Sequence, residues 1–165
     1  MKVKSCPIPA ESILVTDAAK ANFSDAYEVE NPQPDCSALA VWLSTVKKTP
    51  RWVNQSMALR NTIVAHLGLK HSGDLSSFDF SKPAQNYKVG DRVGLFTVYD
   101  ITENEVVMGE TDKHLDVRIS LFKSNHGGRV VVSTLVHIKN GLGHLYMFFV
   151  KPMHRIIVPT MLSKI

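Results

Sequence analysis

The stretch Asp91 to Lys139, DRVGLFTVYDITENEVVMGETDKHLDVRISLFKSNHGGRVVVSTLVHIK, decides the fold of this chain. Within it apolar residues recur at every second position, which is the period of half-buried β-strands. We expect four strands there, at 91–101, 105–112, 114–123 and 129–139. The connections between them are only a few residues long, whereas parallel strands need a crossover of about a dozen residues. The four strands are therefore predicted to be antiparallel neighbours.

The residues after this stretch are expected to add one strand and a final helix. Asn140-Gly141 is a strong hairpin signal, and a fifth strand is predicted over 144–150. The tail 152–165 begins with a proline, which helices accept at their first position, and carries a helical apolar pattern that Pro159 interrupts.

The residues before the stretch predict a strand and two helices. The short apolar run 11–16 is the expected first strand. Helices are predicted over 38–46, capped by Asp35 or Ser37, and over 51–67. Strands and helices are thus segregated along the chain, which is the α+β class, and the last helix is expected to cover the apolar face of the sheet.

Composition and charge exclude several classes of protein. The chain has 165 residues, of which 44% are hydrophobic and 21% charged, the profile of a single globular domain over residues 1–165. The net charge is +4, and its densest basic group, Lys47, Lys48 and Arg51, accompanies no nucleic-acid-binding motif. Cys6 and Cys36 stand in no disulfide framework or metal spacing.

No segment of the sequence predicts export or a membrane span. The longest apolar run is far shorter than the ~20 residues that a spanning helix needs. The N-terminal residues have no continuous apolar stretch of signal-peptide length. We therefore expect a cytoplasmic protein that binds no nucleic acid and spans no membrane.

Four stretches of the chain resemble a known family: Trp52–Asn61, Val89–Phe96, Asp112–Asp116 and Tyr146–Val158. Their order and spacing are similar to those of the domain-of-unknown-function family 2867, over about residues 10–162. The order of the elements is similar to that of the helix-grip superfamily, which includes START-type lipid carriers and polyketide cyclases.

This resemblance implies an antiparallel sheet that grips the C-terminal helix, with two helices inserted after the first strand. It implies no established activity. Some members of the family are fused to a nucleotide-binding oxidoreductase domain, but this chain contains no G-x-G-x-x-G motif.

Arg60 is a candidate site residue because of its position on the second predicted helix. At about 100° per residue it projects into the middle of an apolar face that includes Trp52 and Leu59. A guanidinium group there must find a partner, because an unpaired buried charge is very costly. One interpretation is a buried ion pair with a sheet carboxylate, Asp100, Asp112 or Asp116, of which Asp116 and Asp112 are preferred. The other is an anion anchor inside a ligand cavity.

His114 and Asp116 are the candidate catalytic residues. They alternate with apolar residues on the third strand of the stretch and share one face with Arg118 and Ser120. A histidine and a carboxylate on one face can act as a general base and the group that orients it. The alternative is a solvated outer face with a ladder of ion pairs.

The remaining candidates lie in the last third of the chain. His137 sits in a valine-rich strand, where a lone histidine is more often hydrogen-bonded in the core or at an edge than a ligand. Tyr146 and Phe148 belong to an apolar run that would line a cavity or fill a core. His154 lies near the start of the last predicted helix, where it would cap or pair with another group. No metal-helix spacing such as H-E-x-x-H occurs, and we expect neither metal nor cofactor.

Three hypotheses about function follow. The first is a module that binds a small apolar or amphipathic ligand, lipid-like or aromatic, in a cavity between the sheet and the C-terminal helix. The second is an enzyme of the cyclase, dehydratase or isomerase type that uses acid–base side chains in the same cavity. The third is an interaction or oligomerisation domain, whose partner would be a second copy of the chain or an oxidoreductase-type protein. The ligand-binding candidates are Arg60, His114, Asp116, His137, Tyr146, Phe148 and His154.

Overall fold

The computed structural model describes residues 2–66, 80–124 and 126–165; for Arg60 and residues 63–66 it describes the backbone alone. Within these residues seven strands form one antiparallel sheet in the order β1-β2-β7-β6-β5-β4-β3. The bounds are β1 Lys4–Ser5, β2 Phe23–Glu30, β3 Arg92–Val93, β4 Phe96–Ile101, β5 Glu105–Thr111, β6 Leu115–Ser124 and β7 Arg129–Ile138. The α+β class and the antiparallel arrangement of the predicted meander are confirmed.

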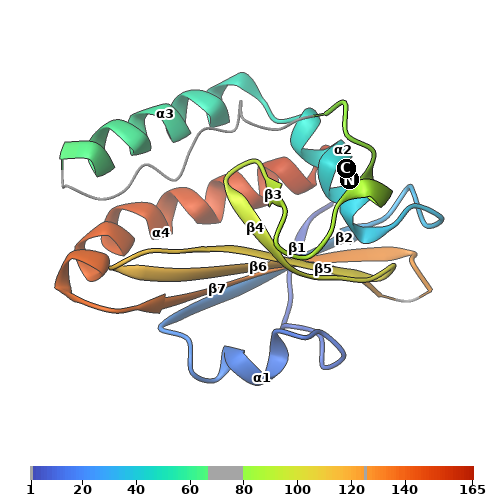
Figure 1. The fold of residues 1–165 in the computed structure, drawn as a ribbon, viewed down its shortest axis with the longest axis horizontal. Coiled ribbons are helices and arrows are strands. Elements are labelled where there is room, and N and C mark those ends of the chain that lie inside the picture. The colour runs from blue at the N-terminus through green and yellow to red at the C-terminus, as the bar shows by residue number, and fades with distance from the viewer. Residues whose placement is uncertain (1, 67–79, 125) are drawn as a thin grey trace.

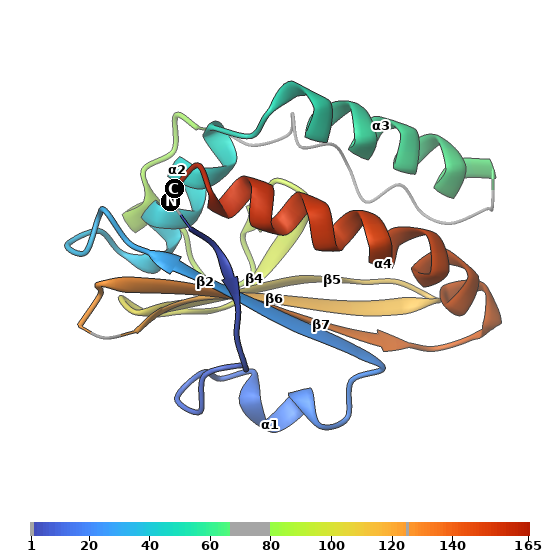
Figure 2. The ribbon, with the colours of Figure 1, turned by 180° about the vertical axis from the view of Figure 1, so that it is seen from behind.

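The helices lie on both sides of the sheet (Figures 1 and 2). Helices α2 (Ala38–Lys47), α3 (Arg51–His66) and α4 (Gly141–Leu162) cover one face, while the short α1 (Val15–Ala18) lies against the other. A 3-10 turn, η2 (Ala84–Asn86), precedes β3. We call α2, α3 and α4 the helical layer. None of the helices in the described part of the chain is both long and apolar enough to cross a membrane.

The predicted helices 38–46 and 51–67 are confirmed as α2 and α3, although residue 67 lies outside the described residues. Of the two cap candidates, Ser37 is the N-cap of α2, and its side chain accepts a hydrogen bond from the amide of Ala40 at 3.3 Å. Strands β5, β6 and β7 lie where the alternation predicted them. The first predicted strand of the meander is divided into β3 and β4 by a turn in which Gly94 has φ 60°.

The predicted first strand at 11–16 is wrong. Those residues form a turn and enter α1. Strand β7 pairs with β6 on one side and with β2 on the other, and β2 was not predicted. The apolar side chain of Leu14 packs against Val107 and Leu135 beneath the sheet. The run is apolar because it covers the sheet, so its composition resembled that of a strand.

The predicted strand at 144–150 and the hairpin at Asn140-Gly141 are also wrong. Both segments belong to α4, a helix of 22 residues, and Asn140 is its N-cap, accepting a hydrogen bond from the amide of Gly143 at 3.1 Å. A short apolar run has the same composition in a buried strand and in a helix, so its period could not separate the two. The last helix therefore begins at Gly141, eleven residues before the predicted start at residue 152.

Two prolines, Pro152 and Pro159, lie inside α4. Each lacks the N–H that would bond the carbonyl four residues earlier. The carbonyls left without that partner belong to Phe148 and Arg155, which are both exposed. Water can hydrogen-bond to these carbonyls, and this explains why the helix continues through the prolines.

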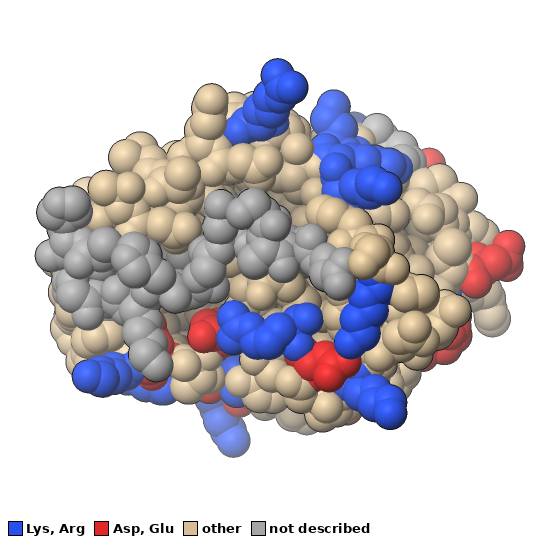
Figure 3. Space-filling view, turned by 45° about the horizontal axis from the view of Figure 1, so that its top comes forward, with Lys and Arg blue, Asp and Glu red and all other residues tan. Residues whose placement is uncertain are grey.

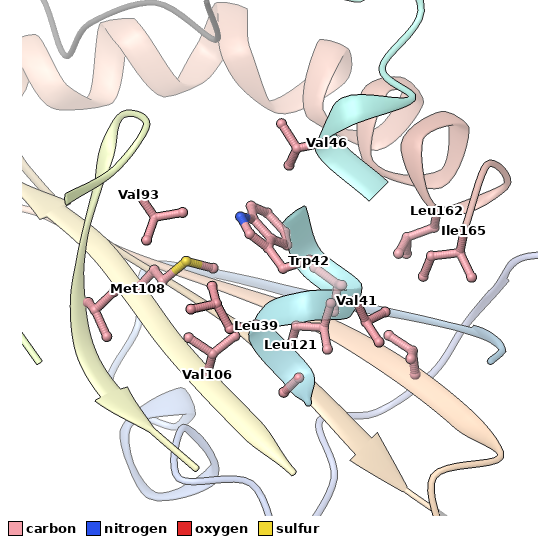
Figure 4. Close-up of a cluster of buried hydrophobic side chains, with 14 of the residues drawn as sticks. Leu39, Val41, Trp42, Val46, Val93, Val106, Met108, Leu121, Leu162 and Ile165 are labelled. Carbon is pink, nitrogen blue, oxygen red and sulfur yellow. The ribbon is translucent and has the colours of Figure 1, made fainter. Parts of the chain in front are cut away.

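The main core lies between α2 and the middle of the sheet (Figure 4). Leu39 and Val41 of α2 are buried among side chains from β5 and β6, including Val106, Met108 and Leu121. Leu162 and Ile165 close this core from the C-terminal end of the chain. Helix α2 thus occupies one half of the covered face, and the other half lies under α3 and α4.

Candidate functional site

A cavity of about 310 Å³ lies between the sheet and the helices α3 and α4. Strands β2, β5, β6 and β7 form its floor, the two helices contribute its walls, and the β3–β4 turn closes one side through Leu95 and Phe96. Most of the side chains around it are apolar. The polar side chains that line it are Ser56, Glu110, Asp112, Thr134, Tyr146 and His154.

The floor follows the register of the sheet. Phe23 of β2 pairs with Val136, Val136 pairs with Val117, and Val117 pairs with Glu110 of β5. Directly paired residues project to the same face of an antiparallel sheet. The result is a continuous row across four strands, in which three apolar side chains are followed by one carboxylate.

Helix α4 turns one stripe of its surface toward this floor. Tyr146, Val150 and His154 are spaced four residues apart, so they lie on one side of the helix and all three line the cavity. Met57 of α3 approaches from the opposite wall. The stripe therefore contributes a phenol and an imidazole to an otherwise apolar enclosure.

The imidazole of His154 is held by a carboxylate. Its Nε2 lies 3.1 Å from Oδ1 of Asp25 on β2, and only 18% of the His154 side chain and 12% of the Asp25 side chain are exposed. The ring also packs edge-on against Phe23, with centroids 5.8 Å apart. The other ring nitrogen, Nδ1, has no hydrogen-bond partner among the described residues. The arrangement orients the ring and leaves one nitrogen open to a ligand.

Asp25 lies on the same face of β2 as Phe23 and beside Thr134, its partner on β7. Its second oxygen, Oδ2, is buried and has no hydrogen-bond partner among the described residues. Burial raises the pKa of the neighbouring Tyr27 phenol, and the negative charge of Asp25 raises it further. Tyr27 therefore stays protonated well into the alkaline range.

The carboxylates at the β5 side of the cavity are already engaged. Glu110 Oε2 accepts a hydrogen bond from Nη1 of Arg92 at 3.1 Å, and the same guanidinium donates to the carbonyl of Leu95 at 2.7 Å. Asp112 Oδ1 accepts from the amides of His114 and Leu115 at 2.6 and 2.8 Å. These contacts stabilise the β3–β4 turn and the turn between β5 and β6. His154 is the better candidate for contact with a ligand, because one of its ring nitrogens has no partner among the described residues.

Two of the ligand-binding residues expected from the sequence line this cavity, namely Tyr146 and His154. Phe148 does not, because it points away from the sheet and is 74% exposed. Arg60 lies in α3, but its side chain is outside the described part of the structure. The expected ion pair of Arg60 with Asp116 is wrong, because Asp116 lies on the face of the sheet opposite α3. An ion pair with another carboxylate and the anion anchor remain predictions.

Asp116 and His137 lie on the other face of the sheet. They are a directly paired couple on β6 and β7, and they alternate with Val117, which lines the cavity. Asp116 forms an ion pair with Arg118, and His137 Nε2 lies 3.0 Å from Oδ2 of Asp17 in α1. Both therefore contribute to contacts on the α1 side.

His114 precedes β6 and packs at the start of α4. Its Nδ1 lies 3.0 Å from Oδ1 and 2.9 Å from Nδ2 of Asn140, the N-cap residue of that helix. It does not line the cavity, and no hydrogen bond joins it to Asp116 among the described residues. In this structure His114 and Asp116 do not interact: His114 contacts Asn140, and Asp116 contacts Thr111 and Arg118.

Sequence reasoning missed Asp25, whose strand was not predicted. The signal was present as a period-two pattern, because Phe23, Asp25, Tyr27 and Val29 alternate with smaller or charged residues. Asp25 is a charged residue at one of the positions expected to be apolar, so the stretch was not predicted to be a strand. Only the approach of His154, which is 129 residues away in the sequence, explains an acid on the covered face.

The described residues contain no group of three His, Cys, Asp or Glu side chains arranged to hold a metal ion. The site chemistry visible in this part of the chain is therefore that of an imidazole held by Asp25, the carboxylates of Glu110 and Asp112, and three hydroxyl groups in a mainly apolar cavity.

The model of the DUF2867 family, described as proteins of unknown function, matches residues 18–161. The chain belongs to this family. The resemblance to this family is thereby confirmed. The match runs from just before β2 to the last turn of α4, so it includes every described element that lines the cavity. No curated protein and no solved structure matches the chain.

Proposed function

We propose that this DUF2867 protein binds a small apolar or amphipathic molecule, lipid-like or aromatic, in the cavity between the sheet, α3 and α4. The observation that carries the proposal is an apolar cavity of about 310 Å³ with one oriented imidazole on its wall. Ligand sites typically enclose about 300–1,000 Å³ and combine apolar walls with a few placed polar groups. The long C-terminal helix across an antiparallel sheet supports the helix-grip arrangement that the sequence suggested.

The ligand is expected to place its apolar body over the Phe23–Val136–Val117 row and a hydroxyl, carbonyl or carboxyl group at Nδ1 of His154. Asp25 holds Nε2 of the same ring. If Nε2 carries the proton, Nδ1 accepts a hydrogen bond, and if the ring is protonated, Nδ1 donates one. The polar group of the ligand thus has a partner in both states.

The test is native mass spectrometry of the purified protein, followed by thermal unfolding with a panel of fatty acids, phenols and aromatic acids. A ligand at about a hundred times its Kd stabilises the fold by about 2.7 kcal/mol, which raises the Tm of a chain this size by about 5–10 °C. His154→Gln should reduce that rise. The control is His144→Gln, an exposed histidine of the same helix outside the cavity lining, which should keep it.

Absence of any co-purified mass, together with no rise in Tm across the panel, would overturn the proposal. A rise that is equal in His154→Gln and His144→Gln would locate the ligand away from His154 and contradict the assigned anchor.

A second candidate function, an acid–base enzyme of the isomerase or dehydratase type, is favoured by the Asp25–His154 pair. A histidine oriented by a buried carboxylate is the usual design of a general base. The test is to incubate the protein in D₂O with each carbonyl compound that it binds. Deuterium incorporated next to the carbonyl by the wild type and lost in His154→Gln would support it, whereas compounds recovered without deuterium would leave binding as the function.

A further inference from the structure

The helical layer carries cations and no acids. Residues 36–73 and 141–165, which include all of α2, α3 and α4, contain none of the 15 Asp and Glu residues of the chain. Among the described side chains, the exposed cations of these helices are Lys47, Arg51, Lys151 and Arg155, and Lys48 and Lys164 follow directly after α2 and α4. On the face drawn in Figure 3 the acidic side chains gather in the lower half and at the right-hand edge. Among the described residues, α2, α3 and α4 therefore contribute positive charge and no negative charge to this side of the molecule.

The outer side of α4 is also apolar and exposed. The exposed fractions are 45% for Leu145, 74% for Phe148, 55% for Phe149, 40% for Met153 and 55% for Ile156. At 100° per residue these five positions fall within an arc of about 140° that is centred on the side of α4 away from the sheet and reaches the edge of the cavity at Phe149 and Met153. We call these five side chains the apolar stripe. An exposed apolar surface of this kind marks an interaction site.

The two features occur on the same helix. Lys151 and Arg155 flank the apolar stripe on one side, and no residue of α4 is acidic. An apolar face bordered by Lys and Arg is typical of helices that lie in the interface of a bilayer, with the apolar side chains inserted to the level of the headgroups. We propose that the helical layer docks on the surface of a bilayer that contains anionic lipids, through the apolar stripe and the flanking cations.

A second copy of the chain fits this surface less well. Placing two such layers together would bring Lys151 and Arg155 toward cations of the same kind, without a carboxylate in either layer to neutralise them. Phe148 and Phe149 pack edge to face with ring centroids 5.3 Å apart, so they project from the helix as one apolar unit. Such a unit can be buried among lipid chains without a shaped pocket.

The cavity adjoins the proposed docking surface. Phe149 and Met153 belong to the apolar stripe and also line the cavity. A ligand would thus meet the cavity next to the bilayer. Docking itself rests on the exposed stripe and its charge, and it stands whether or not the cavity binds a ligand.

The experiment is co-sedimentation of the full chain with vesicles of phosphatidylcholine alone and of phosphatidylcholine mixed with phosphatidylserine. We expect binding to the mixed vesicles that weakens as salt is added, because salt screens the attraction. Phe148→Ser should lower the affinity about tenfold or more, since it removes one inserted aromatic side chain. Phe148 lines no part of the cavity, so a ligand-induced rise in Tm should survive this change.

The matched control for Phe148→Ser is Ile13→Ser. Ile13 is 45% exposed and lies just before α1, on the opposite face of the sheet, so its replacement should leave vesicle binding unchanged. For the charge, Arg155→Glu should weaken binding at least about fivefold, since each cation near an anionic surface contributes about 1 kcal/mol. Lys20→Glu is the same reversal of charge beside α1, on the opposite face of the sheet, and should leave vesicle binding unchanged.

Three results would overturn the proposal. One is equal sedimentation with and without phosphatidylserine, and another is a loss in Phe148→Ser no greater than in Ile13→Ser. The third is a dimer in light scattering that Phe148→Ser dissociates, which would assign the stripe to a second copy of the chain.

Discussion

Glu105 shows how one buried side chain joins the segment before α1 to the sheet. Only 4% of it is exposed, and its carboxyl group accepts hydrogen bonds from Ser12 Oγ at 2.6 Å and Ser120 Oγ at 2.5 Å. The amide of Ile13 donates to its other oxygen at 3.0 Å. Three donors from two elements thus converge on one residue at the start of β5.

Glu105→Ala is expected to destabilise the fold by about 3 kcal/mol, because it leaves buried donors without an acceptor. Glu105→Gln retains one acceptor oxygen and should cost less, about 1 kcal/mol. Urea unfolding measures both. Glu30→Ala, at the exposed end of β2, is the control and should lie within about 0.5 kcal/mol of wild type. Equal midpoints for Glu105→Ala and Glu30→Ala would show that the hydrogen bonds to Glu105 add no stability.

At the scale of elements, the first turn of α4 is positioned by the close approach of Gly143 to the sheet. A Cβ atom at Gly143 would lie 2.6 Å from the carbonyl oxygen of His114 and 2.9 Å from Cγ2 of Ile138. Gly141, in the same turn, has nothing within 4 Å of such an atom. The helix therefore starts in contact with β6 and β7 at one glycine and in open space at the other.

These two glycines form a matched pair for mutation. Gly141→Ala should stabilise the protein by about 0.5–1 kcal/mol, because alanine restricts the unfolded chain and favours the helix. Gly143→Ala should destabilise it by about 1–3 kcal/mol, because the methyl group displaces the helix from the sheet. Thermal unfolding of both variants is the measurement. A rise in Tm for Gly143→Ala would contradict the packing described for this turn.

At the scale of the whole molecule, the covered face of the sheet is divided into a packed half and a hollow half. Helix α2 and the C-terminal residues fill one half with side chains. The half beneath α3 and α4 encloses the cavity. Stability and ligand binding should therefore be separable by changes confined to the hollow half.

Val117→Phe tests this separation, because Val117 lies in the middle of the cavity floor. The larger side chain occupies space that a ligand would use, so the rise in Tm on addition of a ligand should be lost while the free protein remains folded. Thermal unfolding with and without a binding compound measures both quantities. Val89→Phe, at a position 61% exposed and outside the cavity lining, should keep the rise in Tm. An undiminished rise in Val117→Phe would place the ligand elsewhere.

The parts of the fold that the sequence predicted are those with strong local signals. Strand β6 alternates apolar and polar residues, β5 and β7 contain apolar runs, and α2 begins with a serine cap. The alternation of β6 determines within the segment which of its faces is buried, and the apolar runs of β5 and β7 are typical of strands that are buried on both faces. The antiparallel pairing follows from the short connections.

The sequence by itself determined the α+β class, the antiparallel meander, the helices α2 and α3 and membership of the family. Only the tertiary structure decided that residues 144–150 are helical and that Asp25 meets His154. It also decided which face of β6 lines the cavity, which removed His114 and Asp116 from it. The physical reason is the same in each case. A short apolar run, or a polar residue on a covered face, acquires its role from groups distant in sequence, and no local period records their approach.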